Sequence, residues 1–266
     1  MKKNEIITKM NSDSVRYAEY EELLLRRDRL IRESGSILTA YTAEFGDMIN
    51  ENFELKIKCI RTKKAISYCH RLMNRGLTVN VDRMNDELDK EMKLYYVQLK
   101  EMLNHTKDCK DSGTISEMRL SRSKKIYRRL AKLLHPDMNS AVSGNKKLME
   151  LWDKIYEAYL ASDAEELENL EALAGRLLKS EGGETFIPNT DNLEERIERI
   201  ENRINEILTS EPYIYSEILE DEEKKAAHRS MLEDEHSEYE EYLKALTAVL
   251  TELLGSGGIS LTWQMN

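Results

Sequence analysis

Residues that break helices are rare in this chain, and their rarity limits the folds open to it. The 266 residues include three prolines and eleven glycines, whereas leucine, isoleucine and methionine recur every three or four positions over long stretches. This spacing predicts long helices with one apolar face. With 34% charged residues, the chain has the composition of helical and coiled-coil proteins, so we expect an all-α fold with almost no strand.

The helix breakers divide the chain into three expected domains, and the first is a long helical hairpin over residues 1–111. Its apolar stripe is broken at "NRGLTVNVD", where Gly76 is the expected C′ residue and Asn80 or Asp82 the next N-cap. Two long helices joined by a short turn are expected to fold back on each other. A third helix is expected at "VRYAEYEELLLRRDRLIRES", residues 15–34. The stripe comprises Leu38, Tyr41, Phe45, Met48, Phe53, Ile57, Ile60, Ile66, Cys69 and Met73, and continues after the turn.

The last expected domain, residues 181–266, is an acidic coiled-coil hairpin with a short tail. Isoleucines in "NLEERIERIENRINEIL" recur at steps of four and three, the seam spacing of a coiled coil. The break at Pro212 suggests that residues 213–254 fold back as the antiparallel partner of this seam. Acidic side chains greatly outnumber basic ones throughout this stretch.

The middle domain, residues 112–180, begins with a basic helix that runs into His135-Pro136-Asp137. Proline lacks an N–H and disfavours helical geometry in the residue before it, so the helix should end near Leu134. On a helical wheel the apolar side chains oppose a basic stripe, although a charge run taken alone is usually a solvated face. The basic residues of this face are Arg122, Lys124, Lys125, Arg128, Arg129 and Lys132.

A second amphipathic helix follows the loop "HPDMNSAVSGNKK". Its apolar face holds Leu148, Trp152, Ile155 and Tyr159 at steps of four, three and four. These side chains can meet those of the basic helix across an antiparallel pair. We therefore expect the tripeptide to project at the tip of a two-helix hairpin, beside an uncovered basic face.

The stretch from about 116 to 163, less than a fifth of the chain, resembles helices II and III of a J-domain, the module of DnaJ-type co-chaperones. The resemblance rests on "IYRRLAKLLHPDMN" followed by "LWDKIYEAYLASD". It implies an all-α fold in which a J-domain-like antiparallel helix pair is flanked by long antiparallel coiled-coil hairpins. The matching positions are Tyr127, Leu130, Ala131, His135, Pro136, Asp137, Asn139, Trp152, Ile155, Glu157, Ala158 and Tyr159.

Three departures from the family pattern point to a specialised J-protein rather than a general-purpose one. The family's short first helix is missing at its usual distance, and "LYYVQLKEML" at 94–103 is the candidate to replace it. Met138 stands where the family commonly has lysine or arginine. The basic fourth helix is replaced by "AEELENLEALAGRLL", and neither a Gly/Phe linker nor a zinc-binding cysteine domain follows.

The resemblance implies that this protein binds a DnaK-type ATPase chaperone and stimulates its ATP hydrolysis. His135, Pro136 and Asp137 would enter the partner's interdomain junction, where Asp137 would meet an arginine. The basic helix would steer docking toward an acidic surface, and the coiled-coil arms would bind a client or partner protein. The chaperone-binding residues implied are His135, Pro136, Asp137, Arg122, Lys125, Arg128, Arg129 and Lys132.

Other function classes find less support in the sequence. The alternative reading is a coiled-coil scaffold with a degenerate J-like module, and a nucleic-acid binder is disfavoured by the net charge of −10. Cys69, His70, His105 and Cys109 are candidate zinc ligands, but the first two are adjacent on a helix and so point in different directions. No combination of nucleophile and base suggests an enzyme, and no cofactor or metal is expected.

The sequence also predicts where the protein is found. We expect no membrane span and no secretory signal. The odd number of cysteines fits reduced thiols in a cytoplasm. Helical hairpins of this kind can also pair between two copies of the chain, so a homo-oligomer is a possible state.

Overall fold

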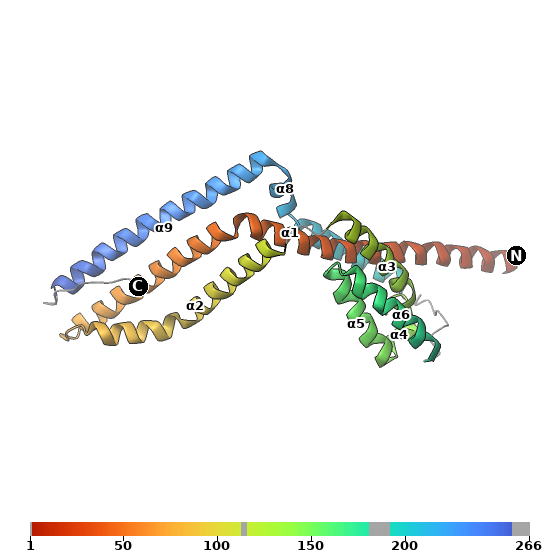
Figure 1. The fold of residues 1–266 in the computed structure, drawn as a ribbon, viewed down its shortest axis with the longest axis horizontal. Helices are drawn as coiled ribbons and strands as arrows, with labels where there is room; N and C mark the ends of the chain where they lie inside the picture. Colours follow the sequence, from red (N-terminus) through yellow and green to blue (C-terminus); the bar gives the residue numbers. More distant parts are fainter. Residues whose placement is uncertain (1, 113–115, 181–191, 257–266) are drawn as a thin grey trace. The chain divides into compact units, whose positions relative to one another are not determined.

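The computed structural model describes residues 2–112, 116–180 and 192–256, and every regular element in these ranges is an α-helix (Figure 1). The expected all-α class is confirmed. None of the described helices combines the length and the apolar run that a bilayer crossing needs. The tail after residue 256 and the break at 181–191 lie outside the described residues. The helices are α1 (Lys2–Met73), α2 (Val81–Asp111), α3 (Glu117–Leu134), α4 (Ser140–Ser143), α5 (Lys146–Leu160), α6 (Ala164–Ser180), α7 (Leu193–Thr209), α8 (Tyr215–Glu220) and α9 (Glu222–Ser256).

The chain forms two compact units, and each combines stretches that are distant in sequence. The first unit consists of Met1–Leu38 and Gly113–Ser216, and the second of Thr39–Ser112 and Glu217–Asn266. The sequence predicts three domains that are each one continuous stretch of chain. The two observed units are instead each formed by two separate stretches that contact one another. The two divisions share one boundary, near residue 112.

One helix of 72 residues, α1, opens the chain. The prediction of a separate third helix at residues 15–34 is therefore wrong, because that stretch lies within the first half of the continuous helix α1. A lone glycine costs a helix interior only about 1 kcal/mol, so Gly35, which lies inside α1, does not end it. Tertiary contacts on both halves outweigh this cost.

The second unit is built from the second half of α1, together with α2 and α9 (Figure 1). Gly76 has a φ of 69°, and the Asn80 side chain caps α2 by accepting from the backbone N–H of Arg83, as the sequence predicts. Arg61 contacts Asp89 at 2.6 Å, and Lys110 contacts Asp47. The later residue of α2 thus meets the earlier residue of α1, which is an antiparallel pairing. The core includes Ala65, Tyr68, Cys69, Val79, Met84, Leu88, Leu250 and Leu254.

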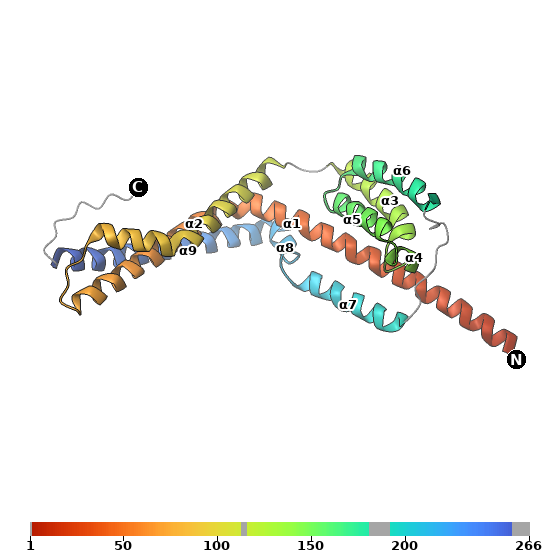
Figure 2. The same ribbon diagram turned by 90° about the horizontal axis from the view of Figure 1, so that it is seen from below.

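The apolar seam of α7 is buried, but the prediction that residues 213–254 cover it is wrong. Ile197, Ile200, Ile204 and Ile207 pack in one cluster with Tyr20, Leu24 and Leu30 of α1 and with Met138. Figure 2 shows α7 beside the first half of α1. An isoleucine seam predicts that a face is buried, and the partner that buries it is decided by the whole fold.

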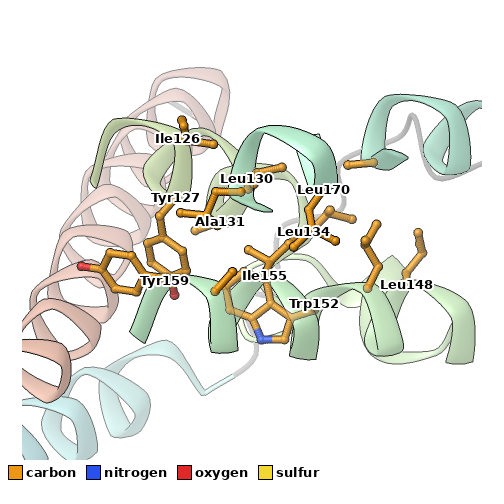
Figure 3. Packing of buried hydrophobic residues seen from close by; sticks show 14 of the residues in the cluster. Ile126, Tyr127, Leu130, Ala131, Leu134, Leu148, Trp152, Ile155, Tyr159 and Leu170 are labelled. Atoms are coloured by element: carbon orange, nitrogen blue, oxygen red, sulfur yellow. The ribbon is translucent and has the colours of Figure 1, made fainter. Parts of the chain in front are cut away.

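The rest of the first unit is a helical cluster in which α3, α5 and α6 pack against one another. Figure 3 shows their apolar side chains meeting in one core, with the rings of Tyr127 and Tyr159 face to face. The two ring centroids lie 3.8 Å apart at an interplanar angle of 9°. The helix pair α3 and α5 is covered by α6 and by the first half of α1. Residues 94–103, the expected replacement for the family's first helix, belong instead to the second unit.

Candidate functional site

The His-Pro-Asp loop begins where α3 ends, at Leu134. The backbone N–H of His135 closes the helix by donating to the carbonyl of Ala131 at 2.9 Å. The loop then folds on its own side chains, because His135 Nδ1 accepts from the backbone N–H of Asp137 at 3.0 Å. Asn139 Nδ2 donates to the carbonyl of Leu133 at 2.9 Å, so the loop returns toward α3.

His135 does not project from the tip of the hairpin, which corrects the expectation for this residue. It is only 2% exposed, and its ring centroid lies 4.6 Å from that of Trp152 in α5. Nδ1 accepts the hydrogen bond within the loop, so Nε2 is the ring nitrogen left to contact the rest of the chain. That nitrogen faces the first half of α1.

A buried carboxylate on α1 lies opposite this histidine. Asp28 is fully buried, and its Oδ2 is 3.7 Å from His135 Nε2. The same oxygen accepts from the Tyr127 hydroxyl at 2.7 Å. Arg27 donates to the other carboxylate oxygen from Nε at 2.9 Å and from Nη2 at 2.6 Å. A buried charge is tolerated only when it is paired and hydrogen-bonded in this way.

The pKa values of this network follow from burial and from charge. Burial alone raises the pKa of the Asp28 carboxyl, but contact with His135, the charge of Arg27 and the Tyr127 hydrogen bond bring it below the usual range. The pKa of Tyr127 is raised, first by burial and then by the neighbouring Asp28 charge. Asp28 is therefore an ionised carboxylate that holds α1 against α3.

Asp137 is the most accessible member of the tripeptide. Its side chain is 50% exposed, and the Arg27 guanidinium approaches its carboxylate at 3.7 Å. Arg196 of α7 donates to the backbone carbonyl of Asp137 and lies over the Tyr20 ring. Pro136 is half-buried. The loop therefore presents one carboxylate to solvent, beside an arginine of its own chain.

Met138 is a core residue in this structure. It is 1% exposed and lies in the cluster formed by α1 and α7. The Tyr17 hydroxyl donates to its backbone carbonyl at 2.6 Å, and burial raises the pKa of Tyr17 to about 12. The departure from a basic residue at this position thus has a physical reason, because an ammonium group here would lie among apolar side chains.

The sequence predicts an uncovered basic face on α3, and this prediction is wrong. The cations of the face pair with carboxylates on two sides. On one side, α6 supplies Glu168 to Arg122 and Glu171 to Arg129, each through two hydrogen bonds of 2.6 to 2.8 Å. Two of the four glutamates of α6 thus face α3. The arginine side chains are both 57% exposed, so each pair contributes only about 0.2–1 kcal/mol.

On the other side, α1 supplies three glutamates to the same helix. Lys132 pairs with Glu21, Arg128 with Glu22, and Lys124 with Glu33. These three cations remain 43% to 55% exposed. Lys125 is exposed and has no ion-pair partner among the described residues. Of the predicted chaperone-binding cations, four therefore already hold carboxylates of the same chain, namely Arg122, Arg128, Arg129 and Lys132.

Chemically, this site can exchange ion pairs and accept a cation at Asp137. In the described part of the chain, no group of three histidine, cysteine or acidic side chains is placed to hold a metal ion. The four candidate zinc ligands do not gather in one site: Cys109 contacts His105 at 3.8 Å, whereas Cys69 contacts the sulfur of Met84 at 3.9 Å.

Sequence reasoning missed the residues that α1 and α7 bring to the loop. Arg27 and Asp28 lie in "ELLLRRDRLI". Steps of three or four residues from Leu24 reach these two positions, so the apolar stripe of α1 predicts an apolar side chain at one of them. A charged pair at that position is the signal that could have identified them. Nothing local in the sequence marks Arg196.

A scan against protein-family models and searches of the curated proteins and the solved structures find no match to this chain.

Proposed function

We propose that this protein is a J-domain-type co-chaperone that binds a DnaK-type ATPase chaperone and stimulates its ATP hydrolysis. The observation that carries the proposal is the half-exposed carboxylate of Asp137. It lies on a loop between two packed helices, one of which presents a row of cations. A carboxylate and a basic row of this kind suit a partner that offers an arginine and an acidic surface.

The residues around the loop divide into two roles under this proposal. His135 is buried and holds the turn by accepting from the Asp137 amide, so it shapes the loop rather than contacting the partner. Pro136 fixes the backbone angle between the two. Asp137 makes the charge-assisted contact. The cations of α3 steer the approach, namely Arg122, Lys125, Arg128, Arg129 and Lys132.

The second unit is proposed to bind the client or partner protein. Its helix α2 carries large apolar side chains on the surface, with Leu94 80% exposed. Apolar side chains left exposed on a helix are available for contact with a partner protein. The other exposed apolar residues of α2 are Tyr96, Val97 and Leu103.

Asp137→Asn tests the proposal in the full chain. In a single-turnover assay with a DnaK-type chaperone, the wild-type protein should accelerate ATP hydrolysis, and the variant should lose that acceleration with its fold intact. Loss of one partner of a charge pair typically costs about 2–5 kcal/mol of binding. Asp153→Asn removes the same charge from an exposed position on α5 and should stimulate normally.

A second candidate is an interaction scaffold in which the loop serves folding alone. The burial of His135 and the pairing of Asp137 with Arg27 favour it, because both use the tripeptide inside the chain. Equal ATPase rates with wild-type protein, Asp137→Asn and no added protein would support the scaffold and rule out the co-chaperone.

A further inference from the structure

The glutamates of α1 match the cations of α3 as one ordered series. On α3, Lys124, Arg128 and Lys132 are spaced four residues apart and form a single stripe. Their partners run in the opposite order along α1, so that the first cation meets the last glutamate. We call Glu21, Glu22 and Glu33 the acidic stripe of α1.

The same helix also supplies an arginine to the loop. Arg27 lies between Glu22 and Glu33 in sequence and approaches the Asp137 carboxylate at 3.7 Å. Within residues 21–33, α1 therefore presents the two features that the proposed partner must offer, an acidic surface for the basic helix and an arginine for Asp137. This segment of α1 therefore offers the loop and the basic helix the same kinds of contact that the proposed chaperone would offer.

The two sets of contacts differ in how readily they can exchange. Asp28 and Tyr127 are buried and hold α1 in place. The three cations of α3, by contrast, are 43% to 55% exposed, while Glu22, Glu33 and Glu21 are 60%, 34% and 18% exposed. Solvent and salt reach these pairs from the side of the cations and weaken them. Glu33 also contacts Arg32 of its own helix. Side chains on both helices can thus change partners while the helices remain packed.

We propose that the acidic stripe of α1 is an autoinhibitory electrostatic screen over the chaperone-binding face. This inference rests on the proposed function and concerns the regulation of the same site. The three carboxylates neutralise the basic stripe and repel an approaching acidic surface, which lowers the association rate. A partner docks by displacing the glutamate side chains, and Arg27 yields Asp137 to the partner's arginine.

The test compares two triple variants of the full chain that have the same change in net charge. E21Q/E22Q/E33Q removes the acidic stripe and leaves the buried Asp28 network intact. E150Q/E165Q/E195Q removes three exposed carboxylates that do not pair with α3. Thermal unfolding of both proteins shows first that each remains folded.

The association rate with an ATP-bound DnaK-type chaperone is then measured by stopped-flow mixing. At about 50 mM salt the stripe variant should associate roughly 3- to 100-fold faster than wild type, since each of the three pairs accounts for about a 1.4- to 5-fold factor. The charge-matched control should change less than about twofold, and at about 300 mM salt the difference should shrink.

Two outcomes overturn the inference, and they can be told apart. Equal acceleration by both triple variants would mean that bulk charge matters and the stripe does not, and the proposed function would stand. Absence of binding by every variant, with or without the stripe, would overturn the proposed function and this inference together.

Discussion

The hydroxyl of Tyr127 provides the most direct measure of how strongly α1 is held to the loop region. Tyr127→Phe removes the 2.7 Å hydrogen bond to the buried Asp28 carboxylate and keeps the aromatic ring that stacks on Tyr159. A hydrogen bond to a charged group contributes about 1.5–3 kcal/mol to folding. Because both groups are buried, no reduction for solvent screening applies.

The assay is urea unfolding of the full chain, followed through Trp152 fluorescence. Trp152 lies in the core of the first unit, and a Trp263→Phe background leaves it as the single indole. The free energy of unfolding should fall by about 1.5–3 kcal/mol, seen as a lower urea midpoint with an unchanged slope. The transition should report the first unit alone.

Tyr159→Phe is the matched control, because it removes a hydroxyl from the other ring of the same stack. No hydrogen bond is found for that hydroxyl among the described residues. The control should change the free energy of unfolding by less than about 0.5 kcal/mol. If both variants unfold alike, the Asp28 network does not stabilise the unit, and the reasoning that places α1 there through a buried charge is refuted.

Two further predictions concern the same region. Met138→Lys places an ammonium in the apolar α1–α7 cluster and should destabilise the first unit by about 3 kcal/mol or more, against less than about 1.5 kcal/mol for Met138→Leu, in the same urea assay. The folded pKa of Asp28 is lowered, so its contribution is full above the unfolded value of about 3.9 and is lost as pH falls through the folded value. The stability gap between wild type and Asp28→Asn should therefore narrow below about pH 4; a gap constant from pH 7 to pH 2 contradicts this assignment.

The helix pair at the centre of the site could be predicted because its determinants are local. Pro136 ends α3 within a residue of the expected position, and the apolar faces of α3 and α5 can be read from their spacing. Both faces are buried together in one core. The caps at Asn80 and Gly76 were predictable for the same reason.

The pairing between distant segments could not be predicted in this way. The isoleucines of α7 indicate burial, but they fit the apolar stripe of α1 as well as the helix that follows Pro212. Likewise, the wheel of α3 shows a basic face and contains no information about Glu21 or Glu168, which neutralise it. Charge complementarity between segments far apart in the chain becomes visible only once the fold brings them together.

The interleaving of the two units affects how the protein is made. Tyr20 and Leu24 are synthesised early, whereas the isoleucines that cover them lie in α7, near residue 200. At about 5–20 residues per second, translation leaves this apolar stripe without its partner for on the order of ten seconds or more. During that interval the nascent N-terminal segment exposes the kind of surface that general chaperones bind.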